Sequence, residues 1–508
     1  MTPRPDRWRV LAVLCAALSV VIIDVTVLHV AAPAITQDLR PSAVELLWII
    51  DVYPLVVAPL LVATGVLGDR LGRKRMLIAG MVVFGAASAA SAFAPTPPAL
   101  IAARALMGVG GAMIMPVTMS ILRDVFDDRA ERVRAVGIWS AVLACGAAVG
   151  PIVGGVLVEH FWWGSVFLVN VPVLAVVLPF ALWILPESRA SDPPPWDLAS
   201  VVLVGLGVLG LAYGIKEGAS HGFGEPLPAA ALVGGLVLLA AFVRRQLRLP
   251  EALLDVRLFA DRTFAVAVAC VLLSMFALVG LELYFAQYLQ LVIGLEPLAA
   301  SIRLMPLFAA SLAGALLAAR LLERLGTRLA VAAGLAVSTV ALVPLLWLGV
   351  TDEYVLLWPP FVAIGFALEV ALVAANDAII SAVSADRAGG AAAIEETAYE
   401  LGGGLGVAVL GSILTAADAG ALGASAPAAA RESLGRAVEL AGGLPVAAGD
   451  ALVFAAREAF VHGFHVAIAV AIGLLAVSAL LAAVVLRTSV VLKSCGAAAD
   501  PLPDETTP

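Results

Sequence analysis

Three carboxylates stand in an otherwise apolar stretch rich in glycine and alanine, AAAIEETAYELGGGLGVAVLG, which covers residues 391–411. They are Glu395, Glu396 and Glu400, and a carboxyl group in such surroundings can hold either a proton or a cation. A helix that begins near residue 389 and continues to about 417 is long enough to span a bilayer. At ~1.5 Å per residue it places the acids roughly 9–17 Å from its start. Glu396 and Glu400 then share one face, and Glu395 lies about 100° around the helix.

Acids at this depth cost on the order of 3 kcal/mol each on insertion scales, so they normally face a water-filled cavity or a partner. The glycines that follow, Gly402, Gly403, Gly404 and Gly406, allow a neighbouring helix to approach closely. We therefore predict that this helix lines a cavity and presents its carboxylates to protons and a cationic substrate. The alternative is a soluble amphipathic helix with an acidic face, which the composition of the whole chain disfavours.

The composition is that of a polytopic membrane protein. The chain has 508 residues, of which 62% are hydrophobic and 13% charged, whereas soluble domains carry about 25% charged residues. The net charge of −8 gives no support for a nucleic-acid partner. The four cysteines are too scattered for a disulfide framework or a metal site, and we expect no cofactor. The first apolar run, residues 10–35, is too long for a cleavable signal and is expected to be the first span.

Apolar segments predict fourteen transmembrane helices. Most of the 30 Lys and Arg residues fall on one side of these spans, which predicts that both termini are cytoplasmic and that the protein is a multi-pass protein of the inner (plasma) membrane. The external loops are expected to hold Arg40, Lys216, Arg431, Arg436 and Arg457. The predicted spans lie at roughly 10–35, 46–67, 76–94, 98–121, 135–158, 164–185, 198–215, 228–243, 263–290, 299–319, 329–349, 354–383, 389–416 and 461–486.

A short internal repeat indicates two related halves. The sequence DRLGR (69–73) follows the second span, and ERLGTR (323–328) follows the tenth. Parallel halves related about the membrane normal are a transporter architecture with a central site. We predict an N-terminal six-helix half (1–190), a linker with two extra helices (191–250), a C-terminal six-helix half (251–490) and a cytoplasmic tail (491–508). The linker begins with the Pro-rich segment 192–196. The C-terminal half includes a long external loop (417–460), within which residues 430–440 could form a helix or hairpin.

Three further motifs carry polar or small residues in a pattern that needs an explanation. GVLGDRLGRKRML (65–77) predicts a tight cytoplasmic turn, in which glycine permits positive φ and Asp69 pairs with an Arg or a helix N-terminus. Arg104 lies inside the fourth span and needs a carboxylate or carbonyl partner. GAAVGPIVGG (146–155) gives the fifth span a flat face of small residues and a proline bend, and the tenth span offers a complementary small surface at Ser311, Gly314, Ala315 and Ala318.

These motifs resemble those of the major facilitator superfamily, and the resemblance covers nearly the whole chain. IDVTVLH (23–29), WIIDVY (48–53), FWWGSVFLVNVP (161–172) and the acidic stretch at 394–411 are similar to its fourteen-helix drug:proton antiporter branch, in particular to quaternary-ammonium and multidrug exporters. The resemblance implies an all-α membrane protein with the major facilitator fold: two six-helix halves plus two inserted helices. It also implies transport without enzymatic activity.

The resemblance assigns candidate roles to particular residues. It implies a cytoplasmic charge latch at Gly65, Asp69, Arg70, Gly72 and Arg73; an antiporter motif that seals the outer side at Gly146, Gly150, Pro151, Gly154 and Gly155; and proton or substrate binding at Asp24, Asp51, Arg104, Glu395, Glu396 and Glu400. Arg104 is expected to act in proton coupling through Asp24. Alternatives are a plain positive loop for the first set, ordinary helix packing for the second and a structural ion pair for Arg104.

Some positions depart from that branch. His29 stands where an Asn is usual and is expected to be a hydrogen-bonded substitute, with a proton relay as the alternative. Asp24 is expected to be the deeper of the two N-terminal acids, and Asp51 is expected near the outer surface. The tenth span lacks an acid found in some relatives. Glu282, Glu369 and Asp377 are additional acids, each with a cavity role or a structural role.

The predicted function is proton-coupled export of lipophilic, cationic drugs or antiseptics by alternating access. One acid-lined cavity can hold a proton or a lipophilic cation but less readily both, and this competition couples the two fluxes. The partners expected are small lipophilic molecules, protons and the lipid bilayer, and the protein is expected to be monomeric. The main alternative is a dedicated exporter of an endogenous product such as an antibiotic. An ATP-driven pump is disfavoured because no GxxxxGK[ST] loop is present.

Overall fold

The computed structural model describes residues 7–126, 128–189, 196–222, 224–250, 252–384, 387–422, 427 and 433–486. Within these ranges every regular element is a helix, and fourteen helical segments are long and apolar enough to cross a membrane. The prediction of an all-α membrane protein with fourteen spans is confirmed. Of the predicted segments, 192–195 of the Pro-rich linker, 430–432 of the outer loop and the tail from 487 lie outside the described residues.

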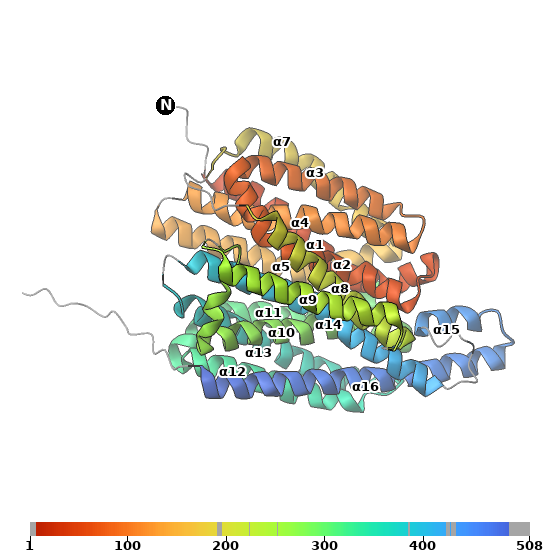
Figure 1. Ribbon diagram of the computed structural model, residues 1–508. Coiled ribbons are helices and arrows are strands. Elements are labelled where there is room, and N and C mark those ends of the chain that lie inside the picture. The colour runs from red at the N-terminus through yellow and green to blue at the C-terminus, as the bar shows by residue number, and fades with distance from the viewer. Residues whose placement is uncertain are drawn as a thin grey trace, which may run out of the picture.

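The first group of helices, which we call the N-terminal group, forms one side of the bundle, and the last group, the C-terminal group, forms the other (Figure 1). The pairs α1 and α5, α2 and α4, and α3 and α4 make its main contacts. Its helices are α1 (Arg7–Leu39), α2 (Ala43–Leu71), α3 (Arg73–Ala92), α4 (Pro97–Val125), α5 (Arg129–His160), the short α6 (Ser165–Leu168) and α7 (Asn170–Ile184).

The last group of helices forms the other side, with α10 packed on α14 and α13 packed on both α11 and α12. Its elements are η1 (Val256–Ala260), α10 (Arg262–Gln287) with the π-helical turn η2 (Tyr288–Val292), α11 (Pro297–Leu325), α12 (Thr327–Leu342) with η3 (Val343–Trp347), α13 (Tyr354–Ser381), α14 (Ala388–Leu422), α15 (Leu434–Ala441) and α16 (Val446–Val485). The two inserted helices, α8 (Leu198–His221) and α9 (Pro226–Arg248), pack on each other; α8 also contacts α2 and α14, one helix of each group.

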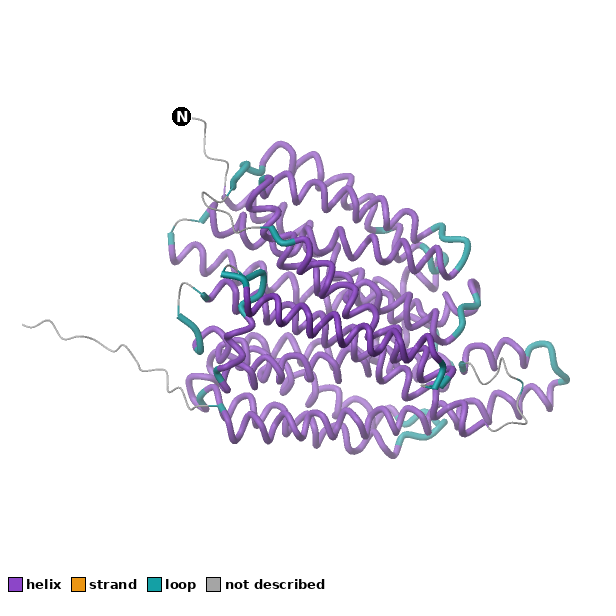
Figure 2. Tube along the Cα trace, viewed as in Figure 1, coloured by secondary structure: helices purple, strands orange, loops and turns teal. Residues whose placement is uncertain are grey.

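The bundle has two ends that the later argument uses. At one end α1 begins and α16 ends; we call this the terminal end (Figure 1). At the opposite end α15 and the beginning of α16 project beyond the other helices, and we call this the α15 end (Figures 1 and 2). The stretch predicted as an external loop at 417–460 is largely helical where it is described, because α14 continues to Leu422 and α16 already begins at Val446.

Local sequence explains where several helices begin. Ser42 and Glu45 form a capping box at the start of α2: the Ser42 side chain accepts from the Glu45 N–H, and the Glu45 carboxylate accepts from the Ser42 N–H. Asp197 caps α8 in the same way by accepting from the Ser200 N–H. These caps satisfy backbone donors that an apolar surrounding would leave without partners.

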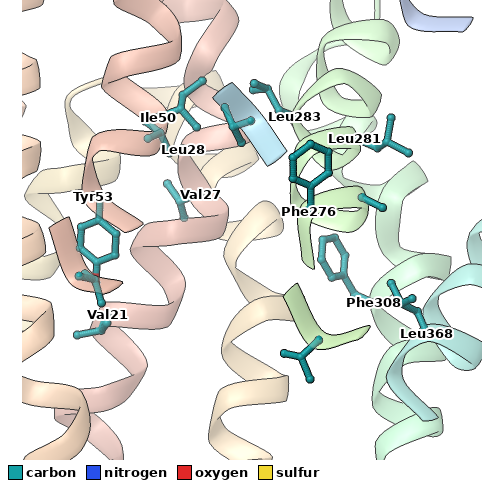
Figure 3. Packing of buried hydrophobic residues seen from close by; sticks show 14 of the residues in the cluster. Val21, Val27, Leu28, Ile50, Tyr53, Phe276, Leu281, Leu283, Phe308 and Leu368 are labelled. Carbon is teal, nitrogen blue, oxygen red and sulfur yellow. The ribbon is translucent and has the colours of Figure 1, made fainter. Parts of the chain in front are cut away.

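Apolar side chains from both groups face each other where the groups meet (Figure 3). Val27, Leu28 and Ile50 come from α1 and α2, and Phe276 and Leu283 come from α10. All belong to one continuous buried cluster. The two groups are therefore joined by apolar contact, and the polar side chains described next interrupt an otherwise apolar interior.

Candidate substrate and proton site

One face of α14 contains two of the three predicted acids. Farther along the same face, Gly404 packs closely on Leu55 of α2 and Gly411 packs on Leu47 of α2, toward the α15 end. Residues 396, 400, 404 and 411 share a helical face because they are four, four and seven residues apart. Glu396 and Glu400 are nonetheless partly exposed. The two groups of helices thus touch toward the α15 end, whereas the two acids keep part of their surface exposed.

Tyr399 is exposed and yet lies among acids from three helices. It interacts electrostatically with the carboxylates of Glu282, Glu369, Glu396 and Glu400, which come from α10, α13 and α14, and yet 42% of its surface is exposed. Glu400 in turn interacts electrostatically with Tyr53 of α2, in the opposite group. The acids of α14 therefore lie near carboxylates of their own group and near Tyr53 of the opposite group, and their lining of a cavity stays a prediction.

None of the three α14 acids is neutralised by a cation within the described part of the chain. The charged neighbours of Glu396 and Glu400 there are other glutamate carboxylates. Glu395 lies next to the neutral amide of Asn376 of α13. Carboxylates without a counter-ion at this depth are costly unless they bind a proton or a cation. In this conformation no described residue holds these three acids in an ion pair.

The glycines after these acids allow two helices to approach α14. A Cβ added at Gly406 would meet the backbone of Phe276, and one added at Gly280 of α10 would lie 2.8 Å from the Gly406 carbonyl oxygen. Gly404 meets Leu55 on the other side, at 2.9 Å. The glycine run thus lets α14 contact α10 within its own group and α2 across the bundle, which confirms the predicted close approach.

His29 and Glu282 meet across the bundle. The Nδ1 atom of His29 on α1 lies 3.5 Å from a carboxylate oxygen of Glu282 on α10, and both side chains are buried. Nδ1 makes no hydrogen bond, so the expected hydrogen-bonded His29 is not found at this atom. Nearby, the Gln290 amide donates to the Val30 carbonyl, which is a second polar contact between the groups.

Glu369 and Asp377, two additional acids, have hydroxyl partners. The Ser311 hydroxyl of α11 donates to Glu369 over 2.8 Å, beside a pocket between α10, α11 and α13 that Glu282 also lines. A carboxylate of α13 thus reaches the region of the tenth span where an acid was missing. Asp377 accepts from Thr327 at the start of α12, toward the terminal end, which is a structural contact.

Asp24 and Arg104 form a buried ion pair, so the predicted partner of Arg104 is confirmed. Each side chain is 1% exposed. The Asn170 amide donates to Asp24 and to Ser88, both over 3.0 Å. The guanidinium of Arg104 also donates to the Ile49 carbonyl and lies over the Tyr53 ring, 4.9 Å from its centroid. This network joins α1, α2, α3, α4 and α7, and its role in proton coupling stays a prediction.

The predicted position of Lys216 is wrong. Lys216 is not in an external loop but inside α8, which continues to His221, and it lies against the fully buried Asp51. The Lys216 ammonium donates to Asp51 over 2.6 Å and lies 3.6 Å from the centroid of the Trp48 ring. The segment after residue 215 has the composition of a polar loop because it contains Lys, Glu and Gly. Pairing with the buried Asp51 carboxylate nevertheless stabilises Lys216 inside the bundle.

The predicted latch has the expected local geometry. Gly72 has φ +119, a conformation that favours glycine, and an added Cβ would collide with Glu187. Arg73 pairs with Asp69, four residues earlier, and with Asp124 at the end of α4. These contacts stay within the N-terminal group, and the closing and releasing of a latch stays a prediction.

The small-residue motif of α5 serves two different contacts. Gly146, Gly150 and Gly154 pack on α1, within their own group, and only Gly155 faces the opposite group. There an added Cβ would lie 2.7 Å from the Leu298 Cα of α11, and the Glu159 carboxylate accepts from the Leu298 N–H. The α5–α11 contact therefore lies toward the α15 end.

Two residues of the surface predicted to complement α5 face another helix. Gly314 of α11 packs on Phe366 and Glu369 of α13, and Ser311 donates to Glu369, so these two residues face their own group and not α5. Glycine spacing indicates that a helix approaches closely, but it does not say which helix.

Two ion pairs lie at the margins of the spans. Asp352, between η3 and α13, accepts two hydrogen bonds from Arg303, and these hold its pKa below the ordinary value. Asp197, before α8, accepts two hydrogen bonds from Arg245 of α9, which lower its pKa to about 2. Both pairs fix helix ends relative to one another.

Sequence reasoning missed several residues of the site. Lys216, Trp48, Asn170, Tyr53 and Tyr399 are all polar or aromatic residues within apolar helices, but only the charge of Lys216 was a signal that could have been read. Had α8 been extended by six residues, its lysine would have counted as an intramembrane cation in need of an acid.

Comparison with known proteins agrees with this geometry. A model of the Major Facilitator Superfamily matches residues 14–407. The methyl viologen resistance protein SmvA of Salmonella typhimurium is 39% identical over 468 residues, which are 91% of this chain and 94% of that protein. The multidrug efflux pump LfrA of Mycolicibacterium smegmatis is 41% identical over 470 residues, 91% and 93% of the two chains.

A third relative and a solved structure complete the comparison. The puromycin resistance protein pur8 of Streptomyces alboniger is 33% identical over 489 residues, 94% of this chain and 91% of that one. The crystal structure of a bacterial homologue of the lysosomal transporter Spinster, inward-facing and unoccupied, has a TM-score of 0.65 at 20% identity and covers 95% of this chain and 98% of that one. At that identity the structural likeness shows the fold.

Proposed function

Because the chain belongs to the major facilitator superfamily and is a multi-pass membrane transporter and not an enzyme, we propose that it is a proton-coupled antiporter that exports lipophilic cations. The observation that carries the proposal is the pair Glu396 and Glu400. These carboxylates share one α14 face, have no counter-cation among the described residues and keep part of their surface exposed. The efflux and resistance proteins named above support the substrate class.

The proposed cycle is a competition for these carboxylates. A lipophilic cation that enters the space between the groups binds the ionised acids, and the apolar and aromatic side chains around them supply contacts of low specificity. Protons that arrive after the groups have rocked neutralise the same acids and release the cation. Each acid is then a shared site for the two solutes, so neither moves without the other.

Contacts between the two groups at the α15 end are proposed to act as the gate on that side. The groups meet toward the α15 end through Gly155 and Leu298 on one flank and Gly404 and Leu55 on the other. Opening that end requires these close contacts to separate. The motif at Asp69 and Arg73 is proposed to hold the terminal end closed in the alternate state.

The orientation and setting are part of the proposal. We place both termini in the cytoplasm and the α15 end outside, in the plasma membrane of a bacterium. We take the protein to act as a monomer that needs a proton gradient and no bound cofactor.

A second candidate is export of one endogenous antibiotic. It is favoured by the 33% identity to the puromycin resistance protein and by a tetracenomycin C resistance and export protein that is 31% identical over 418 residues. The two candidates differ only in substrate.

The experiment that tests the proposal is ethidium efflux from cells that produce the protein, with and without a protonophore. We expect efflux above that of cells with an empty vector and its loss when the protonophore is added. Efflux that continues without a proton gradient would overturn proton coupling, and a panel of drugs in the same assay separates a broad exporter from a dedicated one.

A further inference from the structure

Lys216 occupies a site with the composition of a cation receptor. Its ammonium lies 2.6 Å from an oxygen of Asp51 and 3.6 Å from the centroid of the Trp48 ring, and the side chains of both Lys216 and Asp51 are 0% exposed. A carboxylate beside the face of an indole ring is the combination that recognises substituted ammonium ions. Asp51 and Trp48 of α2 provide this combination, and the ammonium group of Lys216 occupies it.

Lys216 does not satisfy both carboxylate oxygens of Asp51. The second carboxylate oxygen of Asp51, Oδ2, is buried and has no hydrogen-bond partner. Buried polar atoms are nearly always paired, so an unpaired acceptor indicates a place for a further donor or cation. The facing titratable group from the opposite side is Tyr284 of α10, which interacts electrostatically with Asp51. One carboxylate oxygen is therefore left over within this site.

The helix that supplies the lysine lies over the line where the two groups meet. Apart from α9, α8 packs chiefly on α2 of the N-terminal group and α14 of the C-terminal group. Its Val208 and Ala212 form a small buried cluster with Leu55 of α2, and Leu405 of α14 packs against this cluster. When α2 and α14 separate, α8 must lose contact with at least one of them.

We propose that Asp51 and Trp48 form a binding site for an organic monocation with a substituted ammonium group, and that Lys216 is its tethered occupant in the conformation described. The proposal rests on the proposed function of the chain as an exporter of lipophilic cations. When the α2–α14 contact opens, Lys216 leaves with α8 and the cationic group of the substrate takes its place. When the contact re-forms, Lys216 displaces the substrate.

The position of Lys216 allows such an exchange. It lies six residues before Gly222, which ends α8 at the α15 end, so its Cα is about 9 Å from that end. A long lysine side chain can extend along the helix and place its charge in water. Replacement of one ammonium by another leaves the charge of the site unchanged, so the exchange adds no uncompensated charge to the interior.

The test is chemical rescue of Lys216→Ala, which removes the tethered ammonium and leaves its space. The purified variant is titrated with propylammonium and with tetramethylammonium, and 1-propanol serves as the uncharged control. We expect both cations, but not propanol, to raise its unfolding temperature in a saturable way, and we expect no such rise in the wild type. Adding Asp51→Asn should abolish the response, and adding Trp48→Leu should weaken the apparent affinity at least tenfold.

A second measurement connects the site to the substrate. Since the tethered competitor is gone, ethidium should bind Lys216→Ala at least tenfold more tightly than the wild type, and Asp51→Asn should reverse the gain. If Lys216→Ala does not accumulate as folded protein, its folded yield with propylammonium against propanol during purification becomes the readout, and the cation should raise it.

Equal responses of wild type and Lys216→Ala to the cations would overturn the proposal, as would a response that persists after Asp51→Asn or ethidium affinity that does not change. Ethidium efflux by the wild type is measured in parallel. Its absence would refute the proposed function, whereas intact efflux with no cation response would refute only this site.

Discussion

Gly155→Ala should shift the protein away from the conformation described. The added Cβ would lie 2.7 Å from the Leu298 Cα, 2.9 Å from the Ser301 hydroxyl and 3.1 Å from the Leu298 N. Carbon atoms in good contact are about 3.5–4.0 Å apart, so α5 and α11 have to separate by roughly 1 Å at this point. Because α5 and α11 belong to opposite groups, the strain falls on the contact that keeps the α15 end closed.

The size of the shift follows from the cost of overpacking. An extra methyl group forced into a packed contact costs about 1–3 kcal/mol. A difference of that size changes the equilibrium between two conformations by a factor of about 5–150. If the closed α15 end is favoured by no more than this in the wild type, the open state becomes a major species in the variant.

Gly154→Ala is the matched control. Its Cβ would meet Val27 of α1 at 3.1–3.5 Å, which is tight but lies within one group. Both substitutions gain the same helix propensity, about 1 kcal/mol, so this term cancels between them. Gly154→Ala can therefore affect stability but should leave the balance between closed and open α15 ends unchanged.

The assay is the distance between two spin labels at the α15 end, measured by pulsed electron paramagnetic resonance after replacement of the native cysteines. Labels at Phe161 and Val355 suit this purpose because both side chains are exposed, 65% and 76%, and belong to opposite groups. We expect a second, longer distance in Gly155→Ala and none in Gly154→Ala. Identical distributions in folded wild type and Gly155→Ala, or an equal shift in both variants, would refute the reasoning.

Two further predictions concern ion pairs. Arg104→Met should lower the free energy of unfolding by about 3–5 kcal/mol because it leaves Asp24 charged and buried, and Asp24→Asn added to it should recover most of that loss in chemical denaturation; additive losses would contradict the pairing. For Asp197, hydrogen bonds from Arg245 lower the pKa to about 2, so the pair stabilises the folded state fully above the unfolded pKa of 3.8 and loses that effect as the pH falls toward 2. The difference in unfolding temperature between wild type and Arg245→Gln should thus be constant above pH ~5 and shrink steadily as the pH falls through about 2. A difference that grows on acidification would refute this sign.

Much of the fold could be predicted from the sequence because hydropathy alone defines spans in a membrane. The architecture was predicted from three sequence features: fourteen apolar segments, the loops rich in Lys and Arg, and the repeated DRLGR-like turn. The pairing of Arg104 with Asp24 was also predictable, since a buried guanidinium needs an acid and few were available.

The rest depended on which face of each helix meets which neighbour. Gly314 indicated a close contact but not that its partner is α13, and Ser311 gave no sign that it would donate to Glu369. Lys216 was misplaced because a polar helix end in a membrane has the composition of a loop, and only the buried acid opposite reveals it. Facing partners are set by tertiary packing, which short sequence patterns do not encode.

The central claim is that the carboxylates of Glu396 and Glu400 bind a proton and a lipophilic cation alternately. Its most direct test is ethidium uptake into proteoliposomes with an acidic interior, with Asp377→Asn as the control because that acid has a structural partner in Thr327. The account predicts gradient-driven uptake by the wild type and the control, and a large loss in Glu396→Gln or Glu400→Gln with the protein still folded in the membrane. Full-rate, gradient-driven uptake by both single variants would contradict it.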